Sequence, residues 1–166
     1  MFSGKAHPMD EPGKGFIRDI FAIAKTLGSE IKIAYVPNYE MEVARLLVAG
    51  VDLWLNTPNK PLEASGTSGM KAAHNGVPSL SVLDGWWIEG HIEGVTGWSV
   101  GSPTTASEGD DVEAAELYDK LEKAIVSCYY SDPSRWASVM QQSIAFNASF
   151  FNTQRMVQEY VLSAYY

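Results

Sequence analysis

Cysteine and histidine are scarce in this sequence of 166 residues, and their scarcity excludes several kinds of site. There is one cysteine, Cys128, so no disulfide can form within the chain, and the three histidines lie far apart at positions 7, 74 and 91. We therefore expect no zinc cluster and no other metal site. A reducing, cytoplasmic setting is the default for a chain with so little cysteine.

Positive charge and long apolar runs are also in short supply. Twelve Lys and Arg residues against twenty Asp and Glu residues give a formal net charge of −8. This balance disfavours a phosphate backbone or an anionic lipid surface as a partner, so we expect neither nucleic acid nor membrane. No apolar run approaches the roughly 18 residues of a membrane-spanning helix. The hydrophobic content of 46% is enough for a core, and the length fits one domain.

Helices and strands alternate in the first half of the chain. The pattern predicts helices over 14–28 and 40–49, strands over 31–36, 51–55 and 79–83, and a further helix from Ser65 or Thr67 to Asn75. Parallel neighbours need a crossover that a helix supplies. Residues 1–83 are therefore predicted to form an α/β core, a Rossmann-like parallel sheet with flanking helices.

The pattern changes at residue 84. Residues 84–111 are rich in glycine, tryptophan and polar side chains, which predicts a long surface segment rather than a further strand and helix. Residues 112–166 are predicted to be a helical tail, whose helices start at caps such as Asp132 and Asn152 or Thr153. Its many aromatic residues fit packing faces, or the cover of a neighbouring domain. We expect residues 1–166 to form a single domain.

The run EASGTSGMKAAHNG (63–76) combines small residues, hydroxyls and a lysine at a predicted helix start. A helix N-terminus offers free N–H groups and partial positive charge to an anion, which Gly66, Thr67, Ser68 and Gly69 would let approach closely. The alternative is a glycine that is needed for packing, because glycine inside a helix costs about 0.5–1 kcal/mol relative to alanine. The residues alone leave both interpretations open.

Three charged residues near this run are candidates for chemistry. Lys71 would act as a point charge beside a phosphate or as a nucleophile toward an aldehyde cofactor, unless it is an ordinary surface lysine. Glu63 would accept hydrogen bonds from substrate hydroxyls. Asp84, followed by Gly85, Trp86 and Trp87, comes at a strand end, where open α/β sheets place ligands. The alternative for this last group is a simple turn with two packing tryptophans.

Several stretches together resemble the C-terminal domain of the α-glucan phosphorylases, the glycogen, starch and maltodextrin phosphorylases. They are residues 63–76, GKAHPMDEPGK (4–14), VPNYEMEVARLLVAGVDLWLNTP (36–58) and SVLDGWW (81–87). The resemblance implies the second half of a GT-B glycosyltransferase fold, with two Rossmann-like domains. It also implies phosphorolysis of α-1,4-glucan ends by phosphate, giving glucose 1-phosphate.

The same resemblance assigns residues to roles. Lys71 matches the lysine that carries pyridoxal 5′-phosphate as an internal aldimine, and Gly66, Thr67 and Ser68 match the cradle of its phosphate. The glucosyl-binding residues are matched by Glu63, Ala64, Ser65 and Gly66, and a tyrosine beside the cofactor by Tyr39. Close approach of the cofactor phosphate to this turn would then explain why a glycine is tolerated at position 69. The Ser68–Gly69 pair is similar to the shorter prokaryotic-type members, whereas long animal enzymes have Gly-Asn there.

The length departs from that family, whose members have several hundred residues. No counterpart of the Lys/Arg-rich segment that binds substrate phosphate is present, so we expect a fragment without the N-terminal domain that is inactive alone. An exposed interdomain face would make a homo-oligomer plausible. Two alternatives stay open: a nucleotide-sugar-dependent glycosyltransferase domain of the same architecture, and a non-catalytic module that binds glucan or a partner. Lys71 and the order GTSGMK favour the phosphorylase.

Overall fold

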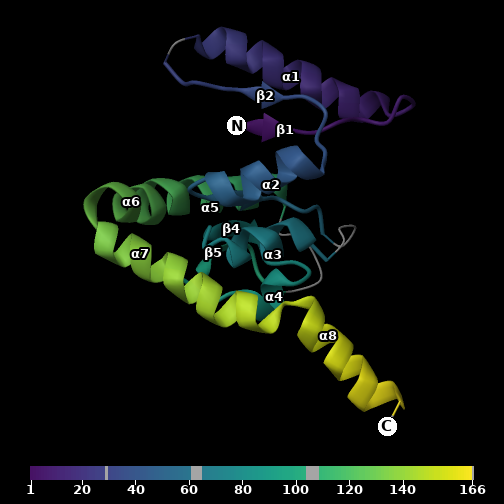
Figure 1. The fold of residues 1–166 in the computed structure, drawn as a ribbon. Coiled ribbons are helices and arrows are strands. Elements are labelled where there is room, and N and C mark those ends of the chain that lie inside the picture. The colour runs from purple at the N-terminus through teal and green to yellow at the C-terminus, as the bar shows by residue number, and fades with distance from the viewer. Residues whose placement is uncertain (29, 61–64, 104–108, 166) are drawn as a thin grey trace. The chain divides into compact units, whose positions relative to one another are not determined.

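The computed structural model describes residues 1–28, 30–60, 65–103 and 109–165, which form an α/β structure of short parallel sheets with flanking helices (Figure 1). The chain divides into two compact units, Met1–Leu47 and Val48–Tyr166. Helix α2 (Met41–Gly50) runs through the boundary between them.

The first unit is a two-stranded sheet with one long helix. Strand β1 (Phe2–Ser3) pairs in parallel with β2 (Tyr35–Val36), and helix α1 (Glu11–Leu27) connects them. The Tyr35 hydroxyl donates to the Gly4 carbonyl at 2.8 Å, and the Ser3 hydroxyl donates to the Val36 carbonyl at 2.8 Å. The strand predicted over 31–36 is therefore confirmed only at its end, because β1 offers just two residues to pair with it.

Local sequence explains where α1 begins and ends. The Asp10 carboxylate accepts a hydrogen bond from the Gly13 amide at 2.9 Å, and Pro12 stands in the first turn, where its missing N–H is no loss. The helix therefore begins three residues before the predicted start at 14. At the other end Gly28 has φ +58°, which ends the helix where the sequence predicted.

The second unit is built on a three-stranded parallel sheet. Strands β3 (Trp54–Asn56), β4 (Ser79–Val82) and β5 (Gly97–Val100) follow one another in space in that order. The register pairs Leu80 of β4 with Leu55 on one side and with Trp98 on the other. All residues of β4 and β5 are buried. Strands β4 and β5 are therefore covered on both faces, as is usual for parallel sheets.

The two faces of this sheet carry side chains of different size. Leu80 and Val82 alternate with Ser79 and Ser81, so large and small residues point to opposite faces. The large face forms the main core of buried side chains with Trp98, Val100, Ile125, Cys128, Trp136 and Val139. On the small face Gly97 leaves room for Trp87, whose Cη2 would lie 2.9 Å from a Cβ at position 97.

Helices of the second half supply that core. Residues 110–131 form a continuous helix of α5 (Asp110–Lys120), a π-helical stretch η1 (Leu121–Val126) and α6 (Ser127–Ser131). Then follow α7 (Pro133–Gln142), the π-helical stretch η2 (Ser143–Ala148), α8 (Thr153–Tyr160) and η3 (Val161–Tyr165), which Figure 1 shows in light green and yellow. The predicted caps are confirmed: Asp132 accepts from the Arg135 amide and Asn152 from the Arg155 amide. No helix in the described ranges is long and apolar enough to cross a membrane.

The prediction of a long surface segment over 84–111 is wrong in its middle part. That stretch contains the short helix α4 (Trp87–Gly90) and the buried strand β5. The glycines and tryptophans of this stretch serve packing. A strand that is buried on both faces, such as β5, lacks the alternation of polar and apolar residues by which a half-buried strand is recognised. The first half of the chain therefore does not contain the whole sheet.

Candidate functional site

The motif helix begins at the edge of the sheet where the strands end. Helix α3 (Thr67–His74) follows β3, and its N-cap residue Gly66 has φ +78° and ψ 41°, a left-handed conformation that suits glycine. Gly66 offers no side chain to cap the helix. The first amides of α3 therefore form an N-terminus of the kind that binds anions.

The two sides of α3 differ in burial. Gly69, Ala72 and Ala73 are buried, whereas Thr67 and Lys71 are exposed. Residues four apart in a helix share one face, so the Thr67 hydroxyl and the Lys71 amine lie on the same open side, one turn apart. At the far end of α3 the His74 imidazole is bonded to the Phe151 carbonyl at 2.9 Å. The helix is thus held from its C-terminal end while its N-terminal face stays accessible.

Trp86 explains the glycines of the motif. A Cβ at Gly69 would lie 2.9 Å from Nε1 of Trp86, and one at Gly66 would lie 3.1 Å from Cδ1. A Cβ at Gly90 would lie 2.8 Å from Cζ3 of the same ring. The indole occupies the space beside Gly69, and the expectation that a cofactor phosphate presses on this turn stays a prediction. The alternative of a glycine required for packing is confirmed at this position.

The turn after β4 is built around the same tryptophan. The Trp86 amide donates to the Ser65 carbonyl at 3.1 Å, and its ring contacts those of Trp87 and Phe151, with centroids 5.0 and 5.1 Å away. Trp86 is only 5% exposed. Residues 85–87 are therefore a packing turn that also fixes Ser65, the residue before Gly66.

Asp84 lies at the carboxyl edge of the sheet, two residues after the end of β4. Its Oδ2 is buried and has no hydrogen-bond partner within the described ranges. Asn56, at the end of the neighbouring β3, lies near Gly66, since its Nδ2 would be 3.9 Å from a Cβ there. The carboxyl ends of β3 and β4 and the start of α3 therefore meet in one region, where sheets of this class bind ligands.

The predicted site residues are only partly brought together. Ser65, Gly66, Thr67, Ser68 and Lys71 lie together at the start of α3. Glu63 and Ala64 lie outside the described residues. Tyr39 follows β2 in the first unit, and its role beside a cofactor stays a prediction.

Sequence reasoning missed a polar cluster between β5 and α5. Glu93 Oε2 accepts from the Ser99 amide at 3.0 Å and pairs with His91 Nε2 at 2.8 Å, while Glu93 Oε1 pairs with Lys120 at 3.0 Å. Burial alone would raise the pKa of Glu93, but the bonds from His91, Lys120 and Ser99 together lower it. Lys120 also pairs with Glu116, whose carboxylate accepts from the Gly101 amide at 2.7 Å. The Glu–Lys spacing of four along α5 was the visible clue.

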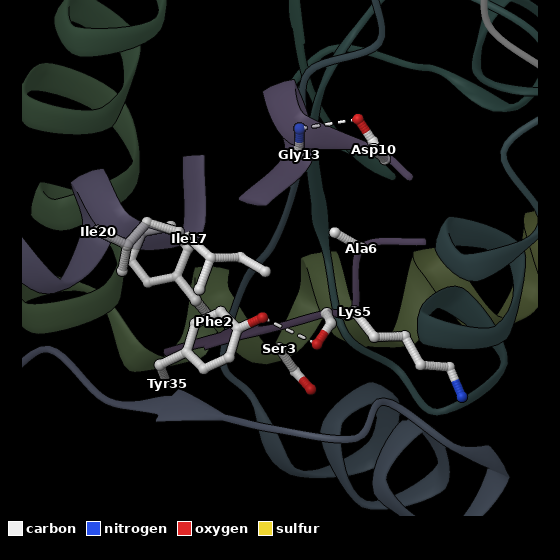
Figure 2. Close-up of a pocket in the computed structure, with 10 residues that line it drawn as sticks. Phe2, Ser3, Lys5, Ala6, Asp10, Gly13, Ile17, Ile20 and Tyr35 are labelled. Atoms are coloured by element: carbon white, nitrogen blue, oxygen red, sulfur yellow. Dashed lines mark hydrogen bonds between the residues drawn. The ribbon is translucent and has the colours of Figure 1, made fainter. Parts of the chain in front are cut away.

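A separate cavity of about 210 Å³ lies in the first unit (Figure 2). Phe2, Ile17, Ile20 and Tyr35 form its apolar wall, and Lys5 extends away from the Tyr35 ring. None of the described residues of the 63–76 motif lines it.

Comparisons with known proteins identify the family. The family described as Carbohydrate phosphorylase matches residues 1–97. The chain is 48% identical to the maltodextrin phosphorylase of Thermococcus litoralis over 164 residues, which cover 97% of this chain and 20% of that protein. It is 42% identical to the glycogen phosphorylase of Aquifex aeolicus, with 99% and 24% covered. The glycogen phosphorylase of Mycobacterium tuberculosis is 40% identical, with 96% and 19% covered.

These matches extend beyond the motif itself. They run on through the helices of the second half, beyond the first hundred or so residues that carry the resemblance seen in the sequence. The chain spans only about a fifth of the length of the curated relatives it matches. By its match over more than half of its residues, the chain belongs to the carbohydrate phosphorylase family.

Proposed function

We propose that the chain is the cofactor-anchoring part of an α-1,4-glucan phosphorylase, which converts glucan ends and phosphate to glucose 1-phosphate. One observation carries the proposal: the accessible face of α3 presents the Thr67 hydroxyl and the Lys71 amine one turn apart, beside a helix N-terminus with no side-chain cap. The names of the relatives, maltodextrin and glycogen phosphorylase, support the reaction class.

The donors at this helix suit pyridoxal 5′-phosphate, which combines a phosphate with an aldehyde. Amides and hydroxyls at Gly66, Thr67 and Ser68 would hold the phosphate, since a helix N-terminus favours a bound anion. The Lys71 amine would anchor the aldehyde covalently. When bound, the cofactor supplies a phosphate group that exchanges a proton with the substrate phosphate. Lys71 then serves to anchor and orient.

The remaining assignments belong to the same proposal. Glu63, Ala64, Ser65 and Gly66 would bind hydroxyls of the transferred glucosyl unit, with Tyr39 beside the cofactor. The sheet would be part of the second Rossmann-like domain of a GT-B fold in a cytoplasmic enzyme. The family match favours this function over the nucleotide-sugar-dependent alternative.

A spectral titration tests the anchoring role. The purified chain is titrated with pyridoxal phosphate while absorbance in the visible range is recorded, and Lys71→Ala and Lys123→Ala are titrated in parallel. Lys123 is a matched control because it is an exposed helical lysine of the same unit and pairs with exposed Asp119. We expect a saturable absorbance change at near-stoichiometric cofactor in the wild type and in Lys123→Ala, and its loss in Lys71→Ala. Equal changes in all three proteins would contradict the proposal.

A further inference from the structure

Lys60 is an unusual residue for its place in the chain. It lies in the loop after β3, yet it is only 7% exposed, and it is the one buried charged side chain in the described part of the chain. Lysine is almost never fully buried unless its ammonium is paired, because removing the charge from water is costly. The Lys60 ammonium donates to the Ser102 carbonyl at 2.5 Å. A specific contact therefore holds this side chain inside.

The bond joins two loops that do not belong to neighbouring strands. Lys60 comes four residues after the end of β3, and Ser102 comes two residues after the end of β5, with β4 between these strands. Neighbouring strands lie roughly 4.8 Å apart, so the two outer strands are about 10 Å apart. This hydrogen bond from Lys60 to Ser102, called the tether below, therefore spans the carboxyl edge of the sheet past the end of β4. The same edge is where α3 begins.

The acceptor end of the tether is itself fixed. Gly101, next to Ser102, donates its amide to Glu116 at 2.7 Å, and Glu116 pairs with Lys120 on the next turn of α5. The Ser102 carbonyl that accepts the bond from Lys60 is therefore next to a residue fixed on α5.

We infer that Lys60 is a positioning residue for the site at the start of α3. Its ammonium holds the loop after β3 against the loop after β5, and so anchors the chain five residues before Ser65, on its approach to the start of α3. The expected effect on cofactor binding rests on the proposed function, since the position of this loop affects binding only if Gly66, Thr67 and Ser68 hold an anion. Lys60 itself is assigned no contact with cofactor or substrate.

Stability and positioning can be separated with Lys60→Met and Lys60→Arg. Methionine keeps the length and the apolar stem of the side chain but removes the charge and the donors, so the Ser102 carbonyl loses this partner and the thermal midpoint reports the cost. Arginine keeps charge and donors. Lys123→Met is the control at an exposed lysine. The readouts are the thermal midpoint, the ¹⁵N order parameters of the backbone, and the half-saturating concentration of pyridoxal phosphate for the absorbance change.

In Lys60→Met we expect order parameters at Asn59 and residue 60 to fall from about 0.85 to below about 0.6, with β4 unchanged. The half-saturating cofactor concentration should rise about two- to tenfold, the range that corresponds to one hydrogen bond. Lys60→Arg should stay near the wild type, and Lys123→Met should match it. Unchanged order in Lys60→Met, or loosening without weaker cofactor binding, would overturn the inference. Absence of cofactor binding at Lys71 in the wild type would instead refute the proposed function. The order parameters would then still show whether Lys60 holds the two loops together.

Discussion

Gly69 lies against the indole of Trp86 so closely that a Cβ at this glycine would be 2.9 Å from Nε1 and 3.0 Å from Cζ2. Real Cβ atoms essentially never come within 3.0 Å of another heavy atom, and a buried tryptophan has little room to move. The glycine in the middle of the motif helix is therefore a packing requirement that sets how α3 sits on the turn after β4.

Gly69→Ala should destabilise the second unit. Overpacking a well-filled core costs roughly 1–3 kcal/mol, which exceeds the gain of about 0.5–1 kcal/mol that alanine brings to a helix. Urea unfolding followed by tryptophan fluorescence measures the difference. Gly50→Ala is the control, because a Cβ there meets nothing within 4 Å. If Gly69→Ala is as stable as Gly50→Ala, the Trp86 ring can move aside at little cost, which would contradict this prediction.

Asp132→Ala should weaken the start of α7. The Asp132 carboxylate accepts from the Arg135 amide at 3.0 Å, and α7 carries Trp136 and Val139 into the main core. Loss of an N-cap acceptor costs about 1 kcal/mol. Asp132→Asn keeps an acceptor and should stay close to the wild type in urea unfolding. If the alanine and asparagine variants unfold at the same urea concentration, the cap contributes nothing.

The stability of the second unit should depend on the charge of Glu93. Its pKa is lower in the folded chain than in the unfolded one, so its contribution is present above the unfolded pKa of about 4.3 and is lost as pH falls through the folded pKa. Glu93→Gln should therefore lower the free energy of unfolding at pH 7, and the deficit should shrink in acid. Urea unfolding at pH 7, and again at an acid pH below the folded pKa of Glu93, measures this difference in the free energy of unfolding. Exposed Glu89→Gln is the control. A deficit that does not change with pH would contradict this sign.

Local chemistry made much of the fold predictable. The helix stop at Gly28, the caps at Asp132 and Asn152 and the start of α3 at Thr67 all depend on residues within a few positions of one another. The alternation of strands and helices up to β4 was also visible, because each element there has its own apolar pattern. These features needed no knowledge of the rest of the chain.

Features that depend on distant partners were missed. Strand β5 is recognisable only beside β4, with Trp87 packed over Gly97. Nothing in the sequence around Lys60 indicates that its side chain is buried, and its partner Ser102 is 42 positions away in sequence. The helix start at Thr67 was predicted, but the packing reason for Gly69 comes from Trp86, 17 residues later in the turn after β4.

The central claim is that Lys71 anchors a cofactor at an anion-binding helix start. Its most direct test is borohydride reduction of the chain with equimolar pyridoxal phosphate, followed by mass analysis of the peptides. This account predicts that the reduced adduct is found on Lys71, disappears in Lys71→Ala, and is suppressed by excess inorganic phosphate competing for the start of α3. An adduct spread over the exposed lysines, with Lys71 no more modified than Lys123, would contradict it.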